Sequence, residues 1–266
     1  FGIAKAKSEI IDNIIENGFV ILNADDKFYN YFKSKALKRN LKIISFSRNN
    51  KSNIKLEKVK SSKNISIIKV NVFGKLRNFI IKRNLEFYVE NILASLAVVS
   101  NYLDINTISE KFFFNYNLPE GRGDYKYIEI NKKKIHLIDE SYNSNPLSLK
   151  FALNNFNKLK SQSKRKIILL GDMLELGKFS KKLHLDAAQN INNTGINRVY
   201  VFGKKIIYTF NKIRPQKRGK VLNSKKDILN FLINDIKNGE YLMIKGSNST
   251  GLNSITQNLK LGMLSA

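Results

Sequence analysis

Beyond residue 124, short apolar runs alternate with segments that carry apolar residues at helical spacing, and this alternation restricts the possible folds most. The runs predict strands and the spaced segments predict helices. The expected strands are YKYIEI and KIHLID, which flank NKKK as a hairpin, and then KIILLGDM, RVYVFG, GKVLN and YLMIKGS. The expected helices are 146–160, 179–193, 204–212, 224–237 and a last one near the carboxyl end. Such an order is typical of an α/β domain whose mostly parallel sheet carries helices on both faces.

The first part of the chain also mixes strand and helix patterns. GFVILNADD (18–26), KIISFS (42–47) and two runs joined near Gly74 predict strands, while 88–103 and NTISEKFFFNYN (106–117) predict helices. Pro119, Gly121 and Gly123 then interrupt the pattern within five residues. We therefore expect two domains, 1–117 and 118–266.

Composition limits the class of protein. The 266 residues are 42% apolar and contain no cysteine, so disulfide and thiolate-metal chemistry are excluded. No apolar run approaches the roughly 20 residues of a membrane span, and the amino end lacks the pattern of a signal peptide. We expect a soluble, cytoplasmic monomer. The chain starts with Phe1 inside an apparent turn into a helix, and we expect it to be a fragment of a longer protein.

The net charge of +26 suggests a polyanionic partner, because basic surfaces attract phosphates. However, lysines are scattered over almost every segment, often beside Asn and Ile, whose codons are also rich in A and T. We therefore expect no dedicated nucleic-acid binding, although a small phosphorylated substrate would benefit from the same field.

Polar clusters follow four of the expected strands. They are Asp139–Asn145, Gly171–Gly177, Gly203 and Lys245–Ser249. Ligands of parallel sheets bind beyond the carboxyl ends of the strands, so these clusters predict one site. The alternative is that such residues only form turns and helix caps, which would by itself account for Ser141 and Asn145.

Several motifs resemble the Mur ligase family, and they extend over essentially the whole chain. IDESYNSNPLSLKFAL is similar to the family's DDSYNANPxSMxAAL, and GDMLELGKFSKKLH to its GDMxELGxxSxxxH. IAKAKSEI, ILNADD, PEGRG and IKGSNS resemble further family segments in the same order. The resemblance implies part of a central ATP-binding domain followed by a Rossmann-like carboxyl-terminal domain. SYNSNP favours the branch that adds D-alanyl-D-alanine to UDP-N-acetylmuramoyl-tripeptide over its relatives.

That resemblance implies ligation through an acyl phosphate with ATP and magnesium, followed by attack of an amine. Lys7 matches the family lysine that is carbamylated and binds magnesium. Asn91 matches a nucleotide-binding asparagine, although Phe87 and Tyr88 replace the family's preceding His and Asn. Arg122 matches the arginine of GRG, and a planar donor of this kind suits ATP phosphates.

The resemblance also assigns roles in the second domain. Asp139 and Glu140 stand where the family has two aspartates that meet the nucleotide or position the closing domain. Tyr142, Asn143 and Asn145 would bind the substrates. Lys245 is placed to meet an anionic substrate group.

Other residues and segments remain open. We assign His184 no proton-transfer role, and Met173, Glu175 and Leu176 are equally compatible with packing and with substrate contact. No GxxxxGK[ST] phosphate loop is present, so we expect that loop upstream and expect this fragment alone to be inactive. We also expect the two domains to close about Gly121 and Gly123. Another amino-acid ligase of the superfamily and, less favoured, a basic nucleic-acid-binding module are the alternatives.

Overall fold

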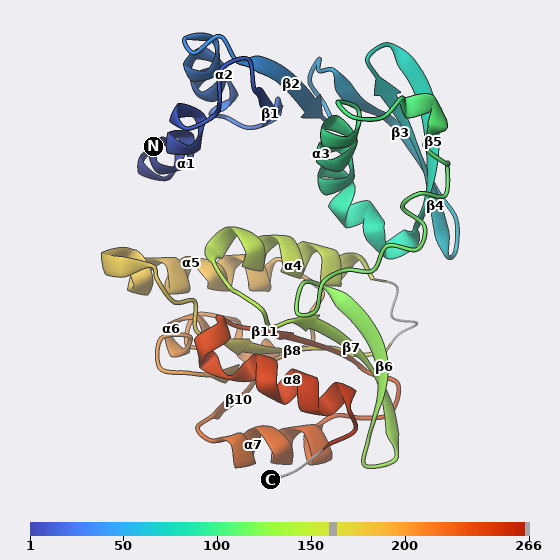
Figure 1. The fold of residues 1–266 in the computed structure, drawn as a ribbon. Helices are drawn as coiled ribbons and strands as arrows, with labels where there is room; N and C mark the ends of the chain where they lie inside the picture. Colours follow the sequence, from blue (N-terminus) through green and yellow to red (C-terminus); the bar gives the residue numbers. More distant parts are fainter. Residues whose placement is uncertain (160–163, 264–266) are drawn as a thin grey trace. The chain divides into compact units, whose positions relative to one another are not determined.

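The structure is a computed structural model, and it describes residues 1–159 and 164–263. The chain divides into two compact units, unit 1 from Phe1 to Tyr116 and unit 2 from Asn117 to Ala266 (Figure 1). Among the described residues, no helix is long and apolar enough to cross a membrane.

Unit 1 is built on a five-stranded sheet in the order β1-β2-β3-β4-β5. The strands are β1 (Phe19–Asn23), β2 (Lys42–Ser47), β3 (Ile54–Ser61), β4 (Ile65–Val72) and β5 (Lys75–Lys82). β1, β2 and β3 are parallel, while β3–β4 and β4–β5 are antiparallel. The helices are α1 (Gly2–Asp12), α2 (Tyr29–Leu37) and α3 (Val89–Val99), and α3 contacts the three parallel strands.

Two sequence expectations for unit 1 need correction. β3 was not expected, and no helix forms at 106–117, where only a short 3₁₀ turn, η2 (Ile105–Thr107), is present. Arg77 of β5 donates hydrogen bonds to the carbonyls of Ile105 and Ile108. In a helix, these carbonyls would instead accept hydrogen bonds from backbone amides four residues later. The aromatic run serves packing instead, because Phe113 is buried edge-on against Phe79.

Unit 2 contains the predicted α/β sheet, in the order β10-β9-β8-β11-β7-β6. The strands are β6 (Asp124–Ile130), β7 (Lys133–Glu140), β8 (Lys166–Gly171), β9 (Arg198–Phe202), β10 (Arg218–Leu222) and β11 (Tyr241–Lys245). All neighbours are parallel except β6 and β7, which form the predicted hairpin.

The helices of unit 2 are α4 (Pro146–Lys158), α5 (Ser180–Asn192), α6 (Ile207–Phe210), α7 (Lys225–Asn230) with the π-helical turn η5 (Phe231–Asp235), and α8 (Leu252–Lys260). Residue 160 of the expected first helix lies outside the described residues. Figure 1 shows α4 and α5 on one face of the sheet and α7 and α8 on the other. Two separate cores result, and consecutive strand residues such as Ile167 and Ile168 enter opposite ones.

The connections reverse direction in the middle of this sheet. The loops that follow β7 and β8 lead into α4 and α5 on one face, whereas the loop after β11 leads into α8 on the other face. β11 lies between β7 and β8. A reversal of this kind opens a crevice at the carboxyl ends of the strands, where α/β proteins bind ligands.

Candidate functional site

The turn after β7 is stabilised by hydrogen bonds to the buried carboxylate of Asp139. Asp139 is 0% exposed, and its Oδ1 accepts hydrogen bonds from the Ser141 amide at 2.9 Å and hydroxyl at 2.6 Å. Its Oδ2 accepts from Lys260 Nζ at 2.5 Å. Both oxygens of Asp139 are therefore engaged by the protein, and the predicted nucleotide contact of this residue stays a prediction.

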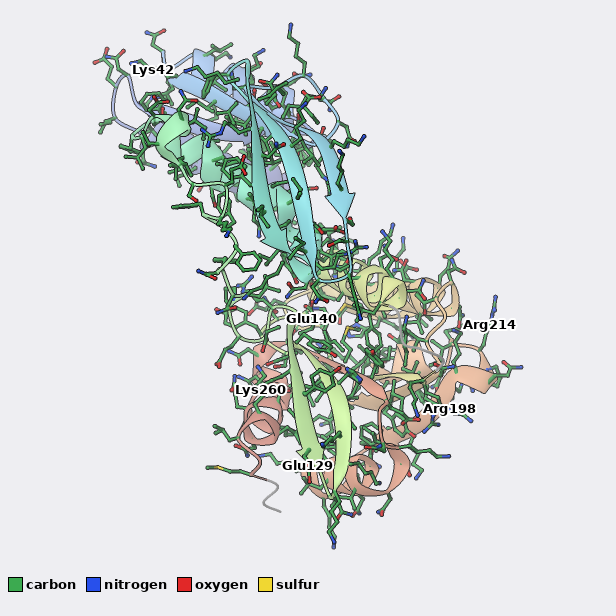
Figure 2. All side chains as sticks on the ribbon, turned by 90° about the vertical axis from the view of Figure 1, so that its right-hand side faces the viewer. Lys42, Glu129, Glu140, Arg198, Arg214 and Lys260 are labelled. Carbon is green, nitrogen blue, oxygen red and sulfur yellow. The ribbon has the colours of Figure 1, made fainter. Side chains whose placement is uncertain are left out.

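Lys245 and Glu140 form an ion pair at the ends of neighbouring strands. Lys245 is 1% exposed, and its Nζ lies 3.4 Å from Glu140 Oε2 and 2.9 Å from the Asn143 carbonyl oxygen, to which it donates. Burial raises the pKa of Glu140, an effect that Lys245 opposes, and burial lowers the pKa of Lys245. Figure 2 shows Glu140 at one end of the β6–β7 hairpin and Glu129 near the other. A substrate anion would reach Lys245 only by competing with this pair.

Three loops of the predicted site are joined by hydrogen bonds around Ser247. Its Oγ accepts from the Leu174 amide at 2.9 Å and donates to the Ser144 carbonyl at 3.2 Å, and its amide donates to the Asp172 carbonyl at 3.0 Å. The loops after β7, β8 and β11 therefore meet, as the sequence predicted. Sequence reasoning did not identify Ser247 as the residue that joins them.

Asp172 and His184 fix the loop after β8. Asp172 Oδ1 accepts from the amides of Lys205 and Ile206, which ties the loop after β9 into the same network. His184 is 0% exposed; its Nε2 accepts from the Met173 amide at 3.1 Å and its Nδ1 donates to the Ser180 carbonyl at 2.8 Å. His184 is thus a buried group that positions the loop after β8. Met173 belongs to the core, which favours packing for that residue.

Arg122 lies against Tyr142. The guanidinium carbon is 4.4 Å from the ring centroid, and both residues are exposed. Their segments are joined by the Tyr142 amide, which donates to the Gly121 carbonyl at 3.1 Å. Gly121 has φ +71°, and a Cβ there would lie 2.8 Å from both the Cβ and the amide nitrogen of Tyr142. Gly121 is therefore required for this close approach, and its hydrogen bonding within unit 2 argues against a free pivot at this residue.

The two asparagines of the turn have structural hydrogen bonds. Asn145 is the N-cap of α4: its Oδ1 accepts from the Ser148 amide and its own amide donates to Ser148 Oγ. Asn143 Oδ1 accepts from the Ser144 amide. Both side chains belong to exposed residues. The cap interpretation of Asn145 is confirmed, and the predicted substrate contacts of Asn143 and Asn145 stay predictions.

The predicted residues of unit 1 lie on separate elements. Lys7 is exposed on α1 and Asn91 is exposed in the first turn of α3. Asn23, at the end of β1, accepts a hydrogen bond from the Asp25 amide. Asp25 in turn accepts from the amides of residues 48, 49 and 50 after β2, so the LNADD motif fixes this edge of the sheet.

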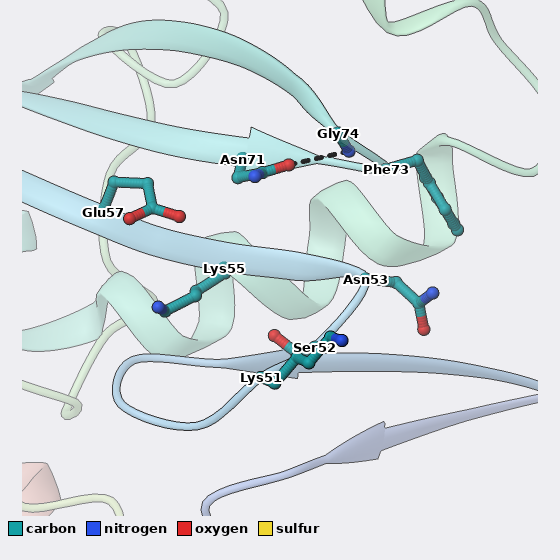
Figure 3. A pocket seen from close by; sticks show the side chains of 8 residues that line it. All are labelled: Lys51, Ser52, Asn53, Lys55, Glu57, Asn71, Phe73 and Gly74. Atoms are coloured by element: carbon teal, nitrogen blue, oxygen red, sulfur yellow. Dashed lines mark hydrogen bonds between the residues drawn. The ribbon is translucent and has the colours of Figure 1, made fainter.

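A hollow in unit 1 is not part of this site. It is lined by Lys51, Ser52, Asn53, Lys55, Glu57, Asn71, Phe73 and Gly74 (Figure 3). The amide oxygens of Asn53 and Asn71 accept from Ser45 and Gly74, so they hold the surrounding turns. None of the residues predicted to act on nucleotide or substrate lines it.

Clustered metal ligands are absent from the described part of the chain. Over residues 1–159 and 164–263, no three His, Asp or Glu side chains gather closely enough to hold a metal ion. Mg²⁺ commonly takes only one or two protein carboxylates and completes its shell from phosphates and water. A single carbamate at Lys7 is compatible with that mode of binding.

Comparison with known proteins agrees with the geometry of both units. Residues 2–99 match the Mur ligase middle domain, and residues 127–248 match the glutamate ligase domain of Mur ligases. The UDP-N-acetylmuramoyl-tripeptide–D-alanyl-D-alanine ligase of Rickettsia prowazekii is 28% identical, over 95% of this chain and 55% of that protein. The enzyme of the same name from Buchnera aphidicola subsp. Baizongia pistaciae is 30% identical, over 97% and 54%.

Solved structures agree in fold. MurF from Acinetobacter baumannii superposes with a TM-score of 0.80 at 21% identity, over 97% of this chain and 55% of that one. MurF ligase from Thermotoga maritima, crystallised with ADP, gives 0.76 at 19% identity, over 98% and 57%. The chain spans about half the length of the curated relatives it matches.

The fold and the joined loops define an α/β protein with a candidate ligand-binding edge on its second sheet. Its two units match two successive domains of one family, and the chain belongs to the Mur ligase family.

Proposed function

We propose that this chain is part of an ATP-dependent ligase that joins D-alanyl-D-alanine to UDP-N-acetylmuramoyl-tripeptide in peptidoglycan precursor synthesis, acting as a monomer. The observation that carries the proposal is the edge of unit 2, where the DESYNSNP turn meets the GDM and KGSN loops through Ser247. The relatives that carry this name match nearly the whole chain, which supports the choice of substrates.

The proposed reaction has two balanced steps. A carboxylate oxygen of the tripeptide attacks the γ-phosphorus of ATP, and ADP leaves. The dipeptide amine then attacks the carbonyl of the acyl phosphate, and phosphate leaves with the original carboxylate oxygen. The amine must lose a proton in the second step, and water must be excluded because it would hydrolyse the intermediate.

Several residues of this chain are proposed to bind the charged groups that take part in those two steps. Arg122 is exposed and offers a planar donor for a phosphate, and Asn91, which is also exposed, is assigned to the nucleotide by its match to the family motif. Tyr142 and Asn143 contact the dipeptide, with Asn145 and the Lys245–Glu140 pair fixing their turn. Lys7, as a carbamate, would contribute one ligand to a magnesium ion, which would neutralise phosphate charge.

The test is a substrate panel with the protein encoded by the complete reading frame. It is incubated with ATP, Mg²⁺ and UDP-N-acetylmuramoyl-tripeptide, together with D-alanyl-D-alanine or with single amino acids. Phosphate release that depends on the dipeptide, with a product of the expected mass, supports the proposal. Turnover with a single amino acid instead would assign the chain to another ligase of the superfamily, and no turnover with any acceptor would reject ligation.

A further inference from the structure

Lys260, the last residue of α8, is buried between two carboxylates. Its side chain is 4% exposed, and Nζ lies 2.6 Å from Asp124 Oδ2 and 2.5 Å from Asp139 Oδ2. Asp124 begins β6 and Asp139 is near the end of β7, so one ammonium group joins three elements. Figure 2 shows Lys260 on the α8 side of the β6–β7 hairpin.

Each carboxylate uses its second oxygen to hold a loop of the candidate site. Asp124 Oδ1 accepts from the Gly121 amide at 2.8 Å. Asp139 Oδ1 accepts from the amide and hydroxyl of Ser141. Hydrogen bonds to ionised groups are the strong ones, and those of a buried network reinforce one another. Lys260 therefore fixes the position of both loops through their carboxylates.

The two loops so held are those of Arg122 and Tyr142. Gly121 precedes Arg122 and accepts from the Tyr142 amide, while the Gly123 amide donates to the Asp139 carbonyl at 2.7 Å. The arginine and the ring stack at 4.4 Å. The same helix contacts this segment a second time, because Gln257 Nε2 donates to Glu120 Oε2 at 2.9 Å.

Loss of the ammonium would affect both loops together. The fully buried Asp139 and the partly buried Asp124 would then be two neighbouring carboxylates of like charge, and a buried charge without its partner is strongly unfavourable. The carboxylates would separate or take up protons, and either change would weaken the hydrogen bonds that they accept from the Gly121 and Ser141 amides.

We propose that Lys260 is a positioning residue, which sets Arg122 and Tyr142 against each other through Asp124 and Asp139 without contacting either. Its role in catalysis rests on the proposed function, because that function places Arg122 at a phosphate and Tyr142 at a substrate. The clamp itself, defined as Lys260, Asp124 and Asp139, is independent of that function. A side chain at the end of α8 thereby determines the geometry of the nucleotide-facing arginine.

The clamp is tested by amide hydrogen exchange on this 266-residue chain, resolved by residue. Lys260→Met should accelerate exchange of the Gly121, Gly123, Ser141 and Tyr142 amides by about tenfold or more, because their acceptors lose fixed positions. Lys260→Arg should recover most of the protection, since a guanidinium can bind two carboxylates. Lys182→Met, an exposed lysine of α5, is the matched control and should change none of these amides. Unchanged exchange in a folded Lys260→Met variant would overturn the proposal.

A milder variant covers the case in which Lys260→Met does not fold. Asp124 is 22% exposed, and Asp124→Ala removes the Gly121 acceptor while leaving the Lys260–Asp139 pair. Exchange should then rise at Gly121 and remain slow at Ser141. If exchange became equally faster at both amides, or did not change at either, then Asp124 and Asp139 would not each hold a separate loop.

Activity is measured separately in the protein of the complete reading frame. Lys260→Met should raise the KM for ATP and lower kcat/KM for ATP by roughly 10- to 100-fold, because small misplacements of a catalytic group are costly. The KM for the tripeptide nucleotide should stay unchanged, and Lys260→Arg should restore most of the loss. A fall in kcat alone would indicate only a smaller folded fraction and would overturn the catalytic part. Absence of ligation in the wild type would reject the proposed function, while the exchange data would still decide the clamp.

Discussion

At the scale of single residues, the close contact between Gly121 and Tyr142 is the most demanding feature of the site. Gly121→Ala would introduce a Cβ at φ +71° and 2.8 Å from Tyr142. Gly251 provides the matched control, since it has φ +78° but no atom lies within 4 Å of the position that a Cβ would take there. Gly251→Ala should therefore cost about 1 kcal/mol from the backbone alone, and Gly121→Ala about 1–3 kcal/mol more from the steric clash.

Urea unfolding of the two alanine variants measures this difference in the free energy of unfolding. Gly121→Ala should also raise the exchange rate of the Tyr142 amide, because that amide donates to the Gly121 carbonyl. Equal destabilisation by the two substitutions would mean that the contact between Gly121 and Tyr142 relaxes without cost.

The half-buried Glu140 leads to a prediction about the pH dependence of stability. Burial raises the pKa of Glu140 above its ordinary value of 4.5, although Lys245 opposes the shift. A raised carboxyl pKa contributes stability that is fully present below the unfolded-state pKa and is lost as pH rises through the folded-state pKa. The free energy of unfolding of the wild type, minus that of Glu140→Gln, should therefore decrease as pH rises above the ordinary carboxyl pKa of 4.5.

Denaturant titrations of both proteins at several pH values provide the measurement. Lys245 strengthens the trend, since burial already lowers its pKa and the glutamine variant removes its counter-charge. A difference that grows with pH would show that the ion pair outweighs burial and lowers the pKa of Glu140.

At the scale of elements, α4 depends on Asn145 for its beginning. The capping box between Asn145 and Ser148 satisfies amides that the helix leaves without intrahelical partners. Asn145→Ala should lower the free energy of unfolding by about 1 kcal/mol, and Asn145→Ser should retain most of it. The serine variant also separates the two roles of this residue, because a substrate contact by Asn145 would leave turnover reduced while stability recovers. Unchanged stability of Asn145→Ala in urea would contradict the capping role.

The same scale accounts for part of the positive charge. Basic side chains donate to carbonyls near the carboxyl ends of helices, where such groups lack partners and the helix dipole favours a cation. The pairs are Arg39 with Ile11, Lys133 with Ile236, Lys166 with Asn157 and Arg218 with Asn211. These cations serve the fold, which weakens the case for a surface dedicated to nucleic acid.

The sequence predicted the sheet of unit 2 well because its strands are apolar runs bounded by turns. It did not reveal β3, since the pairing with β4 shifts register between Leu56 and Lys58. The shift breaks the alternation of apolar and polar residues, so that Val59 rather than Lys58 follows Leu56 in the apolar pattern. The prediction of a helix at 106–117 was wrong for a different reason. The apolar run there favours a helix locally, but tertiary contacts with Arg77 and Phe79 hold the segment in another conformation.

The position of the site could be predicted from the sequence, but its network of hydrogen bonds and ion pairs could not. Strand ends located the loops, and the motifs selected Arg122 and Tyr142. Lys260 carried no local signal, because it reaches Asp124 and Asp139 over more than a hundred residues. Asp172 was more accessible to prediction, since it is the first carboxylate after a buried strand.

At the scale of the whole molecule, the residues proposed to act in one reaction belong to two different units. Lys7 and Asn91 belong to unit 1, whereas Arg122, Tyr142 and Asn143 belong to unit 2. The reaction needs ATP, a carboxylate and an amine together, with water excluded. In the proposed reaction, a carboxylate oxygen passes to phosphate when the dipeptide is joined.

The most direct measurement follows that oxygen. UDP-N-acetylmuramoyl-tripeptide labelled with ¹⁸O in its reacting carboxylate is incubated with the protein of the complete reading frame, ATP, Mg²⁺ and D-alanyl-D-alanine. Mass spectrometry of phosphate and product should find one ¹⁸O in each phosphate released, in equal amount with the ligated product, and only when the dipeptide is present. Ligated product accompanied by unlabelled phosphate would contradict the acyl phosphate, and labelled phosphate with a single amino acid in place of the dipeptide would contradict the proposed substrate.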